Sequence, residues 1–178
     1  MSILNESVFE AALPSRDSAV GRDLRLNLKK VVGESSLSPD EAHLALLAVS
    51  TSVGDQRLAA YSREALKAFD LTAEQIEEAA DSAAIMAMLN TYYRFRHMVG
   101  KDEDYRTAGL RMTALAKPLL GKERFEMLAF AVSILNGCET CIKSHEEVLR
   151  KASVSADKLH DLARLAATVK GLGTLRRE

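Results

Sequence analysis

The stretch Ala131-Val132-Ser133-Ile134-Leu135-Asn136-Gly137 resembles an earlier one, Ala48-Val49-Ser50-Thr51-Ser52-Val53-Gly54, and this repetition indicates how the chain is organised. An offset of 83 residues aligns residues 48–84 with 131–167 without a gap and gives ten identical pairs in 37 positions. Alanine-rich helices match easily by chance, so the shared glycine, which ends an apolar helical pattern in both places, counts for most. The alignment predicts a unit of helix, glycine, helix, cap and helix that occurs twice.

Helical periodicity extends over nearly the whole chain, and we find no convincing alternating pattern of a strand. We predict an all-α fold in a single domain, residues 1–178, with repeat copies at about 39–100 and 121–173. Capping patterns begin two of the helices, at Ser38-Pro39-Asp40-Glu41 and at Thr72 with Gln75. The predicted helices span residues 17–32 (apolar side Val20, Leu24 and Leu28), 38–53, 55–69, 72–99 with a break near Asn90, 105–116, 122–135, 138–151 and 155–172, with a polar turn at 100–104.

The charge of the chain is nearly balanced, with 24 lysines and arginines against 25 aspartates and glutamates and a net charge of −1. This balance gives no indication of a nucleic-acid or anionic-membrane partner. No apolar run approaches the length of a membrane-spanning helix, and residues 1–14 lack the basic and apolar parts of an export signal. We therefore expect a cytoplasmic protein.

The only two cysteines lie in one tetrapeptide, Cys138-Glu139-Thr140-Cys141, and His145 follows. A structural disulfide is not expected in a reducing cytosol, and a bridge over so short a loop removes little chain entropy. At a helix start, exposed backbone N–H groups favour the thiolate form of both cysteines. His145 shares a helix face with Cys141 four residues before it and can accept a thiol proton. The pattern predicts redox chemistry, in which one sulfur attacks a peroxide to become a sulfenic acid and the other condenses with it to a disulfide.

The first repeat copy lacks every reactive residue of this motif. The residues at the positions that correspond to Cys138, Cys141 and His145 are Asp55, Leu58 and Ser62. We therefore assign the chemistry to the second copy alone.

Other uses of the cysteine pair stay open at this point. Zinc would take His145 as a third ligand, but a closed structural site needs four. The candidates for a fourth ligand, none with helpful spacing, are His43, His97 and His160. A thioredoxin-like module is disfavoured because its strand–helix–strand context is missing. Inert core cysteines are less consistent with the spacing and the nearby histidine.

Glu126 lies twelve residues before Cys138, on a helix otherwise apolar from Phe125 to Leu135. Facing inward, it could orient His145 or relay its proton. Facing outward, it would be an ordinary solvated carboxylate near a helix start. The residues alone favour the outward arrangement.

Three charged residues in the second half of the 72–99 helix are assigned no catalytic role. His97 is expected in packing or an interface. Arg94 and Arg96 could hold a carboxylate partner or form ion pairs at a subunit contact, and we favour the subunit contact.

The chain resembles the alkylhydroperoxidase D family, within the carboxymuconolactone decarboxylase-like superfamily, over nearly its whole length. The superfamily's short motif, a Glu followed by Cys-x-x-Cys-x-x-x-His, is matched in full by Glu126, Cys138, Cys141 and His145. Further similar stretches are Arg25-Leu26-Asn27-Leu28, Tyr93-Arg94-Phe95-Arg96 and Gly109-Leu110-Arg111-Met112.

The resemblance implies an all-helical, commonly homotrimeric antioxidant enzyme that reduces organic hydroperoxides and binds no metal or cofactor. It implies that Cys141 is the peroxidatic cysteine, that Cys138 is the resolving cysteine and proton donor, and that Glu126 and His145 form a proton relay. The helix dipole alone would favour Cys138 as the nucleophile, whereas the spacing of His145 supports Cys141. The implied reductant is a dihydrolipoyl group on a lipoylated dehydrogenase-complex subunit, and the implied protein partner is a peroxiredoxin.

One departure from the family concerns Thr140, because well-known members have a histidine immediately before the second cysteine. A hydroxyl cannot take a proton at neutral pH as an imidazole can, so the disulfide-exchange half of the cycle would need another base, for which Glu139 is adjacent. Three functions therefore stand: a peroxidase, an adaptor that passes electrons to a peroxiredoxin, and a non-redox member of the superfamily.

Overall fold

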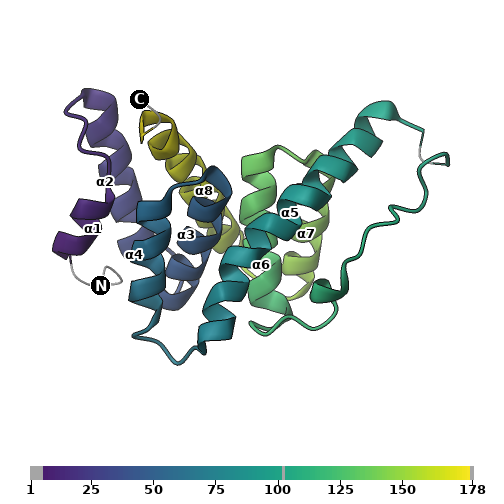
Figure 1. Ribbon diagram of the computed structural model, residues 1–178, viewed down its shortest axis with the longest axis horizontal. Coiled ribbons are helices and arrows are strands. Elements are labelled where there is room, and N and C mark those ends of the chain that lie inside the picture. Colours follow the sequence, from purple (N-terminus) through teal and green to yellow (C-terminus); the bar gives the residue numbers. More distant parts are fainter. Residues whose placement is uncertain (1–5, 102, 177–178) are drawn as a thin grey trace.

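The computed structural model describes residues 6–101 and 103–176, which form helices and connections without a strand (Figure 1). The all-α prediction is therefore confirmed. The elements are α1 (Glu6–Ala12), α2 (Ala19–Gly33), α3 (Pro39–Val53), α4 (Gln56–Leu66), α5 (Ala73–Val99), the short 3-10 helix η1 (Thr113–Leu115), α6 (Lys122–Asn136), α7 (Glu139–Lys151) and α8 (Ala156–Arg176).

Local sequence signals explain most of the helix ends. The side chain of Glu41 accepts a hydrogen bond from the Ser38 N–H at 2.7 Å, and that of Gln75 accepts one from the Thr72 N–H at 2.9 Å. These reciprocal caps begin α3 and α5 where the sequence predicts. Gly54 and Gly137, with φ of 77° and 63°, end α3 and α6 in the left-handed conformation that glycine adopts without strain.

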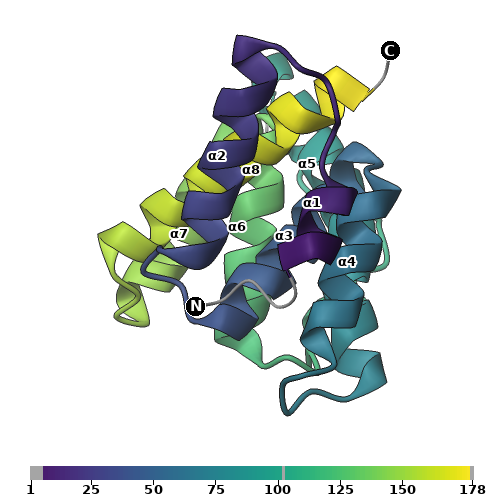
Figure 2. The same cartoon turned by 90° about the vertical axis from the view of Figure 1, so that its left-hand side faces the viewer.

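The two central helices, α3 and α6, carry most of the core. α3 is buried continuously from Ala42 to Ser50, and α6 from Met127 to Ser133. α3 packs against α4, α5, α6 and α8, while α6 also packs against α5, α7 and α8. On one side of this core α2 lies along α8, and α1 lies beside α4 (Figure 2). Helices that are apolar on nearly all sides are core helices, so α6 gives the cysteine motif a rigid support.

The helix predicted at residues 105–116 is wrong. Within it only Thr113–Leu115 form a helical turn, and the other residues are irregular. Gly109 has a φ of 63°, which ends a helix rather than continuing it, and the segment has no continuous buried face. The connecting segment, residues 103–121, instead runs away from the helical body and returns to α6 (Figure 1). Asp102 of the predicted polar turn lies outside the described residues.

The predicted break near Asn90 is also wrong, because α5 continues without interruption to Val99. Asn90 is buried, and its side-chain amide donates to the Ser133 hydroxyl at 2.9 Å, so the polar side chain is satisfied by α6 rather than by breaking its own helix.

The N-terminal region differs from prediction at two points. Val20 is 58% exposed, whereas Leu28 is buried, because only part of the predicted apolar side of α2 packs on α8. Helix α1 was not predicted, since seven residues are too few for a clear period, but it buries Phe9. The first five residues lie outside the described part of the chain. Within residues 6–101 and 103–176, no helix is long and apolar enough to span a membrane.

Candidate functional site

The site is built at the sharp corner between α6 and α7. Gly137 ends α6 in the left-handed conformation, and the Cys138 N–H donates back to the Ser133 carbonyl at 3.2 Å. Cys138 then occupies the N-cap position of α7, and its side chain accepts no hydrogen bond from the free N–H groups of the first turn. This corner brings both cysteines of the motif to the N-terminal end of α7, as the sequence predicts.

The two sulfurs are bonded to each other, and the Cα atoms of Cys138 and Cys141 lie 5.3 Å apart. Their accessibility differs: Cys138 has no exposed surface, whereas Cys141 is 7% exposed. The pair can therefore exist as a disulfide within this fold, and Cys141 is the less completely buried member.

Glu126 and His145 lie in direct contact. The His145 Nδ1 atom is 2.6 Å from the Glu126 Oε2 atom, and both side chains are half-buried. Glu126 comes from α6 and His145 from α7, so the corner at Gly137 folds these two residues together. The outward, solvated arrangement that the residues alone favoured for Glu126 is not what the structure has.

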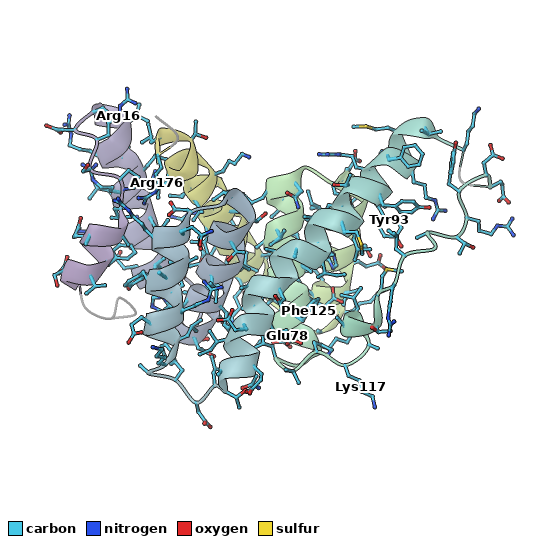
Figure 3. All side chains as sticks on the ribbon, in the orientation of Figure 1. Arg16, Glu78, Tyr93, Lys117, Phe125 and Arg176 are labelled. Carbon is cyan, nitrogen blue, oxygen red and sulfur yellow. A yellow bond between two sulfur atoms is a disulfide. The ribbon has the colours of Figure 1, made fainter. Side chains whose placement is uncertain are left out.

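A pocket of about 390 Å³ opens beside Cys141, within the volume range of small-molecule sites. Cys141, Glu126 and His145 line it, whereas Cys138 does not. Its apolar walls come from three parts of the chain: Met86, Leu89 and Tyr93 of α5, Phe125 of α6, and Met112, Leu115 and Pro118 of the connecting segment. In Figure 3, Tyr93 points from α5 toward the connecting segment. The arrangement provides a reactive sulfur, an acid–base pair and an apolar compartment together.

Polar side chains of α5 hold the end of α6 in place beside the cysteines. Arg94 donates to the backbone carbonyl oxygen of Asn136 at 2.6 Å, and the side-chain amide of Asn136 donates to the side-chain Oδ1 atom of Asn90 at 2.9 Å. Asn90 was interpreted from sequence as a helix break, and Arg94 as a subunit contact. An asparagine inside an apolar helical pattern needs hydrogen-bond partners when it is buried, and this was the sequence signal from which the network could have been predicted.

Thr140 also lines the pocket and is exposed. Glu139, its neighbour, faces solvent and pairs with Lys143. The His97 Nε2 atom lies 3.8 Å from the Glu139 Oε2 atom. The hydrogen bond and charge of Lys143, with a smaller contribution from His97, lower the pKa of Glu139 below its usual range. Glu139 is therefore a poor substitute for an imidazole as a base.

Two of the three histidines considered as a fourth zinc ligand lie away from the cysteines, and His97 instead lies near Glu139. His43 is buried against the rings of Tyr61 and Phe69, and His160 is exposed on α8. In the part of the chain that the structure describes, no group of three or more His, Cys, Asp or Glu side chains could hold a metal ion.

The amino-acid sequence matches a known family. The model of the carboxymuconolactone decarboxylase family matches the chain twice, over residues 21–93 and 104–177, so the chain belongs to that family. Within it, the chain is similar to proteins named alkyl hydroperoxide reductase AhpD. It is 43% identical to the protein from Anaeromyxobacter dehalogenans, over 83% of this chain and 80% of the relative. It is 39% identical to that from Streptomyces avermitilis (93% and 92%) and 37% identical to that from Rhizorhabdus wittichii (94% of both).

Proposed function

We propose that the protein is an antioxidant thiol peroxidase that reduces organic hydroperoxides through a dithiol–disulfide cycle of Cys138 and Cys141. The observation that carries this proposal is the pocket, where one of the two bonded sulfurs, an acid–base pair and an apolar compartment meet. The names of the relatives, which describe alkyl hydroperoxide reductases, agree with it.

The cycle begins from the reduced pair, with Cys141 as the peroxidatic cysteine. Its thiolate attacks the terminal oxygen of the hydroperoxide, the O–O bond breaks, and the alkoxide leaves as an alcohol after it takes a proton. Cys141 is then a sulfenic acid. The Cys138 sulfur attacks the Cys141 sulfur, water leaves, and the disulfide forms. One hydroperoxide and two thiols thus give an alcohol, water and a disulfide.

The roles of the two cysteines follow from their surroundings. Cys141 lines the pocket, so a substrate can reach it, whereas Cys138 is buried beside it and suits a resolving cysteine that also donates a proton. His145, one turn after Cys141, takes the thiol proton, and Glu126 orients its ring and stabilises the imidazolium. This Glu126–His145 relay can deliver the proton that the departing alkoxide needs.

A dithiol must then reduce the disulfide, and we propose a dihydrolipoyl group on a lipoylated dehydrogenase-complex subunit. Thiol–disulfide exchange passes through a mixed disulfide and needs a route to one of the two sulfurs, and the pocket that Cys141 lines can provide it. The second candidate function is an adaptor that passes electrons to a peroxiredoxin and has little peroxidase activity of its own. Thr140 and the low basicity of Glu139 favour this candidate, since both limit proton handling at the motif.

We further propose that the protein forms a homotrimer in the cytoplasm. Several apolar side chains are exposed at the end of α5 and the start of the connecting segment, as expected of a surface that another subunit covers. They are Phe95, Met98, Val99 and Tyr105, with exposed fractions of 41%, 76%, 39% and 36%. A reducing cytoplasm would supply the electrons that the cycle consumes.

The test is consumption of an organic hydroperoxide by the purified protein with a dihydrolipoyl donor, first without and then with a peroxiredoxin. Turnover without the peroxiredoxin supports the peroxidase. Turnover only with the peroxiredoxin supports the adaptor. Absence of turnover in both, with free thiols confirmed, contradicts both functions and leaves a non-redox role.

A further inference from the structure

The pocket beside Cys141 contains one cation that has no partner. Lys122, the first residue of α6, lines the pocket, and its side chain makes no ion pair or hydrogen bond with any described residue. Three other cations near the site pair with carboxylates. Lys143, Lys151 and Arg124 bind the carboxylates of Glu139, Glu147 and Asp40 respectively.

The carboxylate one helix turn from Lys122, the spacing that favours a side-chain pair, is already engaged. Glu126 lies one turn further on α6, a position from which it could pair with Lys122. Its Oε2 atom instead lies 2.6 Å from His145, which balances its charge whenever the imidazole is protonated. Glu126 is the only acidic residue among those that line the pocket. Lys122 is therefore available to an anion that enters from outside.

Lys122 and Cys141 each lie one helix turn from a member of the Glu126–His145 contact, Lys122 on α6 and Cys141 on α7. From Cys141 to His145 is one turn of α7, and from Glu126 to Lys122 is one turn of α6, each about 6 Å along the helix axis. A substrate that reached both residues would thus extend over about 12 Å. The walls between them are apolar, and a lysine stem can lie along such a surface with its ammonium group at the edge.

We infer that the preferred substrates are hydroperoxides of medium-chain carboxylic acids, bound with the carboxylate at Lys122, the alkyl chain along the apolar walls and the peroxide at Cys141. This inference rests on the proposed peroxidase function. The ammonium group is the complement of a carboxylate, and a bound anion at that end stays two helix turns away from the reacting sulfur. A neutral hydroperoxide of the same chain would use the apolar walls alone.

The experiment compares a matched substrate pair: a medium-chain fatty acid with a hydroperoxide far from its carboxylate, and the methyl ester of the same compound. The wild type should turn over the acid with a kcat/KM about five-fold above that of the ester, the effect of a partly exposed ion pair. Lys122→Met should bring this ratio close to one, and Lys122→Glu should reverse it. The readout is the ratio of kcat/KM for the acid to kcat/KM for the ester, because a general loss of activity in a variant lowers both values equally and leaves their ratio unchanged.

Lys117→Met is the matched control. Lys117 is an exposed lysine that does not line the pocket and points away from the helices (Figure 3). Its replacement should leave the wild-type ratio in place. An equal kcat/KM for acid and ester in the wild type, or an unchanged ratio in Lys122→Met, overturns the inference while the peroxidase function stands. Absence of turnover of both compounds by the wild type overturns the peroxidase function and the inference with it.

Discussion

Two helix corners of this molecule have similar backbones but different roles, since one stabilises the fold and the other carries the cysteine pair. At the first, α3 ends at Gly54 and Asp55 begins α4; at the second, α6 ends at Gly137 and Cys138 begins α7. Both glycines have the left-handed conformation. At the offset of 83 residues, Asp55 corresponds to Cys138. The Asp55 side chain caps α4, whereas the Cys138 side chain does not cap α7.

The first corner satisfies its polar groups internally. The Asp55 carboxylate accepts from the Leu58 N–H at 3.1 Å and pairs with Arg176 of α8 at 2.9 Å, and its side chain has no exposed surface. Ser62 donates to the Leu58 carbonyl at 2.8 Å. The second corner has a pocket at Cys141. Reactive thiols at the start of α7 therefore come with the loss of a stabilising helix cap.

The largest expected effect separates the corners by activity. Cys141→Ser should lower peroxidase kcat/KM by at least about 10³-fold, since a serine hydroxyl cannot replace a thiolate as nucleophile. Ser62→Ala, four residues after Leu58 in the first corner, is the matched control and should leave kcat/KM close to wild type. Steady-state peroxide consumption measures both. A similar loss in both variants would show that activity depends on general packing rather than on the second corner.

The next effect separates the corners by stability. Arg176→Met leaves the buried Asp55 carboxylate without a countercharge and should lower the free energy of unfolding by about 3 kcal/mol. Asp55→Asn, added to Arg176→Met, should restore part of that loss because it removes the unpaired charge. Denaturant unfolding measures these values. Reduction of the Cys138–Cys141 disulfide should cost at most about 2 kcal/mol, because the closed loop is short. A larger cost for reduction than for Arg176→Met would reverse the assignment of roles.

Glu126→Gln tests the acid–base pair of the second corner. Loss of the carboxylate should lower kcat/KM by about 10²-fold, within the usual contribution of general acid–base catalysis. The amide keeps the shape of the side chain but cannot stabilise the imidazolium of His145. The pH profile of kcat/KM should change in form as well as in height. A uniform decrease with an unchanged profile would reduce Glu126 to a packing role.

The smallest effect compares the two glycines directly. Gly54→Ala and Gly137→Ala each force an alanine into the left-handed conformation, at about 1 kcal/mol of stability. No atom lies within 4 Å of the added Cβ at either position, so packing does not distinguish them. Only Gly137→Ala should also lower kcat/KM, because only that corner orients cysteines. Equal activity of the two variants would contradict the need for a defined corner geometry at Cys138.

The sequence predicted the features that depend on local signals. The capping patterns at Ser38 and Thr72, and the glycine at each corner, act within a few residues, and the helices they delimit are present. The segment at 105–116 had helical composition, but composition alone does not hold a helix that lacks a buried face. The division of the chain into two repeated units stays a prediction, although the corners are alike in backbone.

The candidate site divides in the same way. The spacing of Cys138, Cys141 and His145 could be read from the sequence because all three lie on one helix. The contact of Glu126 with His145, and the walls contributed by α5 and the connecting segment, depend on how separate elements pack. No local pattern encodes such packing, so the role of Glu126 rested on family resemblance and the pocket was not predicted.

The most direct test of the central claim is to identify the sulfur that an organic hydroperoxide oxidises. In Cys138→Ser the sulfenic acid has no resolving thiol, so dimedone can trap it for detection by mass spectrometry. We predict a dimedone adduct on Cys141 in this variant and no adduct on Cys138 in Cys141→Ser. An adduct on Cys138 formed as fast as that on Cys141, or no adduct on Cys141 at all, would contradict the assignment of Cys141 as the reactive cysteine.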